Sequence, residues 1–184
     1  MRPADVVRPA TRAMRAAGGF ALLAASTACA PQPRTALAPV TDVALAVDRW
    51  LTCYECFDGE LEDVVRAGDA AVPRLASALR GLTPARRTGL QASLSTKWRR
   101  TAAWVVERGR SPAISEAEYV GLHVDNYVAL TQERAAVALG AIGSADSRDA
   151  LMEADAAARD GSIVFRDGVL RTVRTLLAAS GPVR

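Results

Sequence analysis

Apolar residues recur at helical spacing along most of the chain, from about residue 41 onward. Val43, Val47, Trp50, Tyr54 and Phe57 are separated by steps of four, three, four and three residues, which places them on one face of a helix. No stretch of about four to eight residues alternates between apolar and polar side chains as a half-buried strand would. The pattern therefore predicts an all-α protein.

Two further short helices are expected after this stripe. Their apolar positions are, in order, Leu61, Val64 and Val65 before Gly68, and Val72, Leu75 and Leu79 before Gly81. We expect Asp69 to be the N-cap of the second of these helices and Pro73 to lie in its first turn.

A longer helix is predicted from about 84 to 107 because Gly109 and Pro112 follow it. Its inward positions are expected to be Leu90, Leu94, Trp98, Ala102 and Val105 or Val106. Ser115 and Glu118 form an S-x-x-E capping box, which predicts a short helix over 116–124. Three last helices are expected over 126–141, 146–159 and 165–179, separated by Gly143 and Gly161.

The first 28 residues differ from the rest. They begin with a segment containing four Arg and continue with the apolar run AAGGFALLAASTA, which ends in small residues. This order is typical of a secretory signal peptide, and the apolar run is shorter than the roughly 20 residues that span a bilayer. We therefore expect a signal peptide over 1–28, a proline-containing tether over 29–40 and one helical domain over 41–184.

The cleavage region ASTAC resembles the signal of a bacterial lipoprotein. The resemblance implies that Cys29 is lipidated and becomes the mature N-terminus. Ser26 departs from the pattern, because an aliphatic residue is usual three positions before the cysteine. Ordinary cleavage after Ala28 is the alternative. In either case the expected location is the cell envelope, with the protein exported to the periplasm or anchored to a membrane by its lipid.

Two stretches of the chain resemble HEAT-type helical repeats. The first is ERAAVALGAIGSADSRDALMEA and the second is AGDAAVPRLASALRG. The residues that carry the resemblance are Arg134, Ala135, Ala136, Ala138, Leu139, Gly140, Ile142, Gly143, Leu151 and Ala154, with Val72, Pro73, Leu75 and Leu79 in the second stretch. In such repeats Ala and Gly allow close helix approach while Leu and Ile fill each layer. The resemblance implies a short, irregular helical-repeat solenoid or bundle that acts as a binding scaffold.

The net charge depends on the signal peptide. The whole chain has 23 Lys plus Arg and 20 Asp plus Glu, but without residues 1–28 the two classes are equal. The basic character of the full chain is therefore not a sign of nucleic-acid binding, and we expect no nucleic-acid partner.

Cys53 and Cys56 form a C-x-x-C motif. Thr52 and Glu55 form a T-x-x-E box, which predicts a helix that begins at Cys53 and would favour a thiolate. A thiol–disulfide redox function is therefore a second hypothesis, although the βαβ pattern of thioredoxin-like proteins is missing. A zinc site would need further ligands, and a c-type haem would need a histidine after Cys56. A structural Cys53–Cys56 disulfide is favoured in an exported protein.

Residues 80–110 contain eight basic residues and one acid, Glu107. Trp98 and Trp104 lie among them. Such a helix can rest on anionic lipid, but we favour a solvated basic face whose tryptophans belong to the core and pack near the acidic residues 55–69.

Neither His123 nor the acidic residues indicate catalysis. No G-x-S-x-G motif accompanies His123, and the run Glu55, Asp58, Glu60, Glu62 and Asp63 lacks the spacing of a calcium loop. We expect no catalytic, cofactor-binding or metal site. The predicted function is a non-enzymatic, protein–protein interaction scaffold whose partners are unknown envelope proteins and whose membrane contact is the N-terminal lipid.

Overall fold

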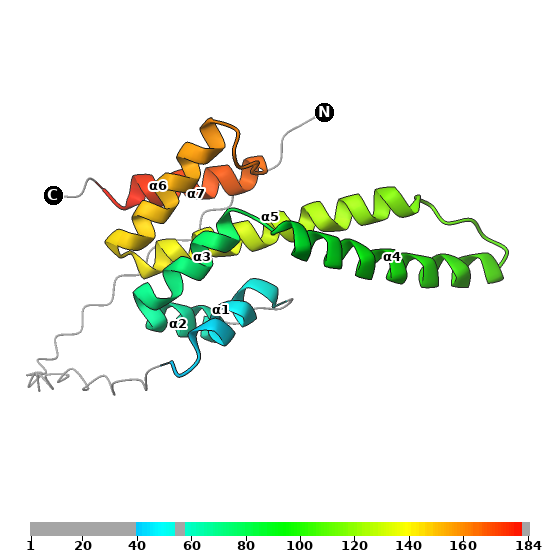
Figure 1. Ribbon diagram of the computed structural model, residues 1–184, viewed down its shortest axis with the longest axis horizontal. Helices are drawn as coiled ribbons and strands as arrows, with labels where there is room; N and C mark the ends of the chain where they lie inside the picture. The colour runs from blue at the N-terminus through cyan, green and yellow to red at the C-terminus, as the bar shows by residue number, and fades with distance from the viewer. Residues whose placement is uncertain (1–39, 54–57, 182–184) are drawn as a thin grey trace, which may run out of the picture. The chain divides into compact units, whose positions relative to one another are not determined.

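The computed structural model describes residues 40–53 and 58–181, and all regular elements in this part of the chain are helices, without strands. The elements are α1 (Val43–Thr52), α2 (Asp58–Ala67), the 3-10 turn η1 (Gly68–Ala71), α3 (Val72–Leu79), α4 (Pro84–Glu107), α5 (Glu116–Ile142), α6 (Ala145–Arg159) and α7 (Asp167–Ala179) (Figure 1). The predicted all-α class is confirmed.

The core surrounds the second half of α5, which contacts α1, α2, α3, α6 and α7. Its small residues Ala135, Ala136 and Ala138 are fully buried, as is Leu139. Because methyl groups take little space, the neighbouring helices approach α5 closely. The other helices contribute the buried positions Val47, Trp50, Val64, Val72, Leu75, Leu79, Leu151, Ala154 and Val173.

Gly140 on α5 lies against Leu176 of α7. A Cβ built at this position would lie 2.5 Å from Cδ2 of Leu176 and 3.1 Å from its Cγ. Leu176 therefore occupies the space that a side chain at position 140 would need.

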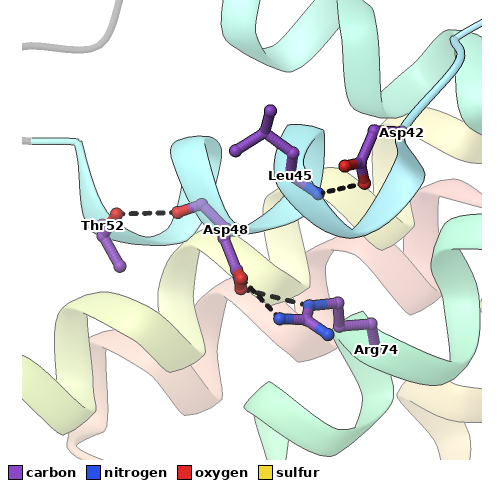
Figure 2. A network of polar contacts seen from close by, with 5 residues as sticks. All are labelled: Asp42, Leu45, Asp48, Thr52 and Arg74. Carbon is purple, nitrogen blue, oxygen red and sulfur yellow. Dashed lines mark hydrogen bonds and ion pairs between the residues drawn. The ribbon is translucent and has the colours of Figure 1, made fainter.

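The first helix is fixed at its start and along its outer side, as Figure 2 shows. The backbone N–H of Leu45 donates to Oδ1 of Asp42, which is the N-cap. Farther along α1, the Nε of Arg74 on α3 donates to Oδ1 of Asp48 at 3.1 Å. This ion pair joins α1 to α3 across 26 positions of the sequence.

The expected helix start at Cys53 is wrong. Thr52 is the last residue of α1, and its hydroxyl donates to the backbone carbonyl of Asp48 at 2.7 Å (Figure 2). Cys53 has extended backbone angles and ends the helix. Because the Thr52 hydroxyl already bonds back into α1, it does not cap a following helix. The expected continuation of the apolar stripe to Tyr54 and Phe57 lies outside the described residues.

The predicted cap of the third helix is also wrong. Asp69 lies within η1, and the residue that precedes α3 is Ala71. The chain passes from the 3-10 turn into α3 with helical angles at the junction, so no side-chain cap is required there. Pro73 does lie in the first turn of α3, as expected.

The two helices predicted over 116–124 and 126–141 form the single helix α5. No Gly or Pro separates them, and the half-buried Tyr127 and Val128 continue the inward face after the buried Val124. The capping box is confirmed, since Ser115 accepts from the N–H of Glu118 while the Glu118 carboxylate accepts from Ser115. Gly143 ends α5 in the left-handed conformation, with φ of 67°.

The α4 helix spans 84–107 as predicted, and its inward positions are those expected from the sequence. Leu90, Leu94, Trp98, Ala102 and Val105 are half-buried, and Val106 is exposed. α4 packs along the first part of α5 (Figure 1). No residue of this 24-residue helix is fully buried. We call α4, residues 108–115 and the first half of α5 the arm, and the remaining helices with the second half of α5 the body.

Candidate functional site

The arm is held together near its far end by one ion pair and one cap. The guanidinium of Arg99 on α4 donates from Nε to Oε2 of Glu116 at 3.1 Å and from a terminal nitrogen to Oε1 at 2.9 Å. These hydrogen bonds lower the pKa of Glu116 and raise the pKa of Arg99. Hydrogen bonds from Ser115 lower the pKa of Glu118 in the same way. Both carboxylates therefore stabilise the turn between the two arm helices.

The far end of the arm exposes apolar side chains. Trp104 is 54% exposed, Val106 59% and Ile114 41%. The guanidinium of Arg108 lies 3.7 Å from the centre of the Trp104 ring. We call Trp104, Val106, Arg108, Arg110 and Ile114 the tip. The prediction that both α4 tryptophans belong to the core is wrong for Trp104, because its helical position turns it away from the α5 side that Trp98 faces.

An open groove lies at the junction of the arm and the body. Its apolar lining comes from Val128 and Ala129 on α5 and from Val164 and Phe165 before α7. Arg87 from α4, Asp125 and Gln132 from α5, and Arg166 complete it. We call this the junction groove. Its walls therefore combine an apolar floor with charges of both signs.

Two polar contacts involve residues that line the junction groove. The Nε2 of Gln132, a buried residue, donates to the backbone carbonyl of Leu79 at 3.2 Å. The guanidinium of Arg166 donates to Oδ1 of Asn126 at 2.6 Å. These contacts fix both walls while Val164, which is 84% exposed, stays at the rim. Val164 is notable for its place beside the apolar lining of the groove, because single exposed apolar residues are common on protein surfaces.

Arg134, one of the residues of the HEAT-like pattern, joins α5 to the end of α1. Its guanidinium donates to the carbonyls of Trp50, Leu51 and Cys53, and the Trp50 indole N–H donates to the Arg134 carbonyl at 2.9 Å. Partial burial lowers the pKa of Arg134. The arginine satisfies carbonyls that the end of a helix leaves without intrahelical partners, so its role is structural.

The cysteines expected to carry lipid or a disulfide are only partly described. Cys29 and Cys56 lie outside the described residues. Cys53 follows α1, with its Sγ 3.3 Å from the Trp50 carbonyl oxygen. The Cys53–Cys56 disulfide therefore stays a prediction, and so does lipidation at Cys29.

His123 is exposed on the arm, where its ring lies 4.2 Å from that of Tyr119. The structure therefore places it on the helix surface beside Tyr119. Of the acidic run, Glu60, Glu62 and Asp63 lie on α2 beside Arg49 and Arg66, and Asp63 pairs with Arg66 at 3.2 Å. The suggested neighbourhood of α4 and this acidic segment is not seen, because α4 packs on α5.

Within residues 40–53 and 58–181, no cluster of three or more His, Cys, Asp or Glu side chains is arranged to hold a metal ion. The helices of the same part of the chain include none with the length and apolarity of a membrane span.

Comparison with protein-family models, with curated proteins and with solved structures gives no match. A function must therefore be argued from the surfaces of this chain alone.

The junction groove could not be found from the sequence. Its lining comes from three separated segments, and Val164 lies in a connection without helical period. The one available signal was the apolar triplet Ile163, Val164 and Phe165, of which Ile163 is buried, Phe165 half-buried and Val164 exposed in the structure.

Proposed function

We propose that this protein is a non-enzymatic, HEAT-like repeat lipoprotein that acts as a protein–protein interaction scaffold in the cell envelope. The observation that carries this proposal is the junction groove, where the nearly fully exposed Val164 stands at the rim of an apolar floor. Isolated exposed apolar residues are common, but one beside a groove with charged walls is suited to a protein partner.

The HEAT-like character is supported by the packing of one helix pair. The second half of α5 and α6 are joined by the left-handed Gly143 and bury Leu139, Leu151 and Ala154. The other HEAT-like stretch contributes α3, which follows α2 through η1 and packs on α5 and α6 with Leu75 and Leu79 buried. The α5–α6 pair thus completes its core against a neighbouring helix, as repeat units do. The arm is then an extension of one repeat helix beyond the stack.

The groove chemistry indicates the kind of segment that would bind. Val128, Ala129, Val164 and Phe165 offer a strip for one or two apolar side chains. The edges of the groove carry charges of both signs, positive at Arg87 and Arg166 and negative at Asp125. A helix or extended segment of another protein with apolar anchors and a mixed polar edge fits this arrangement.

The envelope location rests on the signal-like N-terminus and on Cys29. If the protein is a lipoprotein, mass spectrometry of the mature N-terminus will find a diacylated Cys29. An unmodified Cys29, or a mature chain that begins elsewhere, would remove the lipid anchor from the proposal.

The scaffold function is tested by crosslinking in intact cells followed by pull-down of wild-type protein and of Val164→Asp. A charge at this position opposes burial of the apolar floor, so the specific partner should be lost from the variant. Arg171→Glu, on the exposed side of α7, is the matched control and should retain it. A crosslinking pattern that is the same for all three proteins would contradict docking at the junction groove.

A further inference from the structure

The tip of the arm combines exposed apolar side chains with cations. Trp104, Val106 and Ile114 are each more than 40% exposed, and Arg108 and Arg110 lie between them in the chain. Arg108 stacks on Trp104 and donates to the Trp104 carbonyl at 3.3 Å, so its charge is held beside the ring. This arrangement is separate from the junction groove and is not explained by the scaffold function.

The apolar residues of the tip do not form one flat patch. Trp104 and Val106 are two residues apart on a helix that turns about 100° per residue, so they face nearly opposite directions. Ile114 lies in the connection that follows α4. A single protein surface covers one side of a helix, whereas a layer of lipid headgroups and upper acyl chains can surround an inserted end. The geometry therefore favours a lipid surface.

The charge near the tip is positive. Lys97, Arg100, Arg108 and Arg110 are exposed, and helical spacing places Lys97 and Arg100 on the same flank of α4 as Trp104. Of the nearby acids, Glu116 is paired with Arg99, and the four exposed cations outnumber the two others, Glu107 and the Glu118 carboxylate that accepts from Ser115. Anionic lipids attract such clusters, and tryptophan prefers the bilayer interface.

From these observations we propose that the tip of the arm inserts into an anionic lipid surface. Trp104, Val106 and Ile114 enter the interfacial region, while Lys97, Arg100, Arg108 and Arg110 contact lipid phosphates. The arm thereby gives the protein a second membrane contact besides its N-terminus. The proposal does not depend on the scaffold function.

The test is quenching of Trp104 fluorescence in the full chain by vesicles with brominated acyl chains. Vesicles of mixed phosphatidylglycerol and phosphatidylcholine are compared with phosphatidylcholine alone. Trp50 is buried and Trp98 half-buried, so the quenched component should disappear in Trp104→Phe. Because every variant keeps the same N-terminus, lipid binding by that segment does not change the comparison.

For the double variant Arg100→Glu with Arg108→Glu, the lipid concentration that gives half-maximal quenching should rise at least about tenfold. Each cation near an anionic surface increases the lipid affinity severalfold. Arg171→Glu should leave it unchanged. Val164→Asp should also leave it unchanged, which separates this proposal from docking at the junction groove.

Three results would overturn the proposal. The first is no quenching of the Trp104 component by anionic vesicles. The second is equal quenching by neutral vesicles or by the charge-reversed variant. The third is protection of Trp104 from acrylamide without lipid as protein concentration rises, because that would assign the tip to a second copy of the chain.

Discussion

At the scale of single residues, Arg134 shows how one side chain joins distant segments. It lies more than 80 positions from the three carbonyls that it bonds at the end of α1. The HEAT-like pattern marked Arg134 in the sequence, but its partners depend on the meeting of α1 and α5, which no local pattern encodes. The buried positions Val72, Leu75 and Leu79 were predictable, because helical period alone identifies them.

Replacing Arg134 should destabilise the body. Arg134→Ala leaves the α1 carbonyls without their charged donor, and hydrogen bonds to charged groups contribute about 1.5–3 kcal/mol. We expect a loss of unfolding free energy of that order in urea denaturation. Arg171→Ala, which alters an exposed position on α7, should change it by less than about 0.5 kcal/mol. Equal effects of the two substitutions would contradict the role of Arg134.

Gly140 and Gly121 provide a matched pair within α5. A Cβ at Gly121 meets nothing within 4 Å, whereas at Gly140 it would meet Leu176 at 2.5 Å. Gly121→Ala should therefore stabilise the protein by up to about 1 kcal/mol through helix propensity. Gly140→Ala should instead destabilise it by about 1–3 kcal/mol, because Leu176 must leave its place between the helices. Thermal melts of both variants test this, and a Gly140→Ala protein that melts above wild type would show that Leu176 moves freely.

At the scale of elements, the helices of the arm begin and end at local sequence signals that can be recognised without the structure. The bounds of α4, its inward stripe and the Ser115 capping box were all predicted from spacing and capping residues. The continuity of α5 was not predicted, because its inward face changes partners from α4 to the body near Val124. Two stripes with different partners then look like two helices.

The Ser115 cap makes the start of α5 sensitive to acid. The pKa values of Glu116 and Glu118 are lowered in the folded chain, so their stabilisation is complete above the unfolded value of about 4.3 and is lost as the pH falls through the lower folded values. The protection of residues 116–122 from hydrogen exchange should therefore fall in acid, relative to that of the second half of α5.

Glu118→Gln should reduce this acid dependence, since the replacement does not titrate. Ser115→Ala should open the first turn of α5 at neutral pH, at a cost of about 0.5–2 kcal/mol. Ser144→Ala, which removes the corresponding cap of α6, is the control and should leave the exchange of the arm unchanged. If the protection of residues 116–122, measured relative to that of the second half of α5, does not change with pH in the wild type, the cap does not hold the arm.

At the scale of the whole molecule, the described residues form a body with a small-residue core and an arm whose helix α4 has no fully buried residue. The groove where the two meet is the proposed docking site. The all-α class followed from periodicity, but the groove and the exposed tip depend on tertiary packing. The central claim is that a partner protein binds at Val164.

The most direct measurement is site-specific photocrosslinking in intact cells, with the photoreactive residue placed at Val164. Met152, which is 43% exposed on α6 and outside the groove, is the control position. The scaffold account predicts that position 164 forms a discrete adduct with one envelope protein, and that Val128→Asp in the groove floor abolishes the adduct. Absence of an adduct at 164, or the same adduct from position 152, would contradict the account.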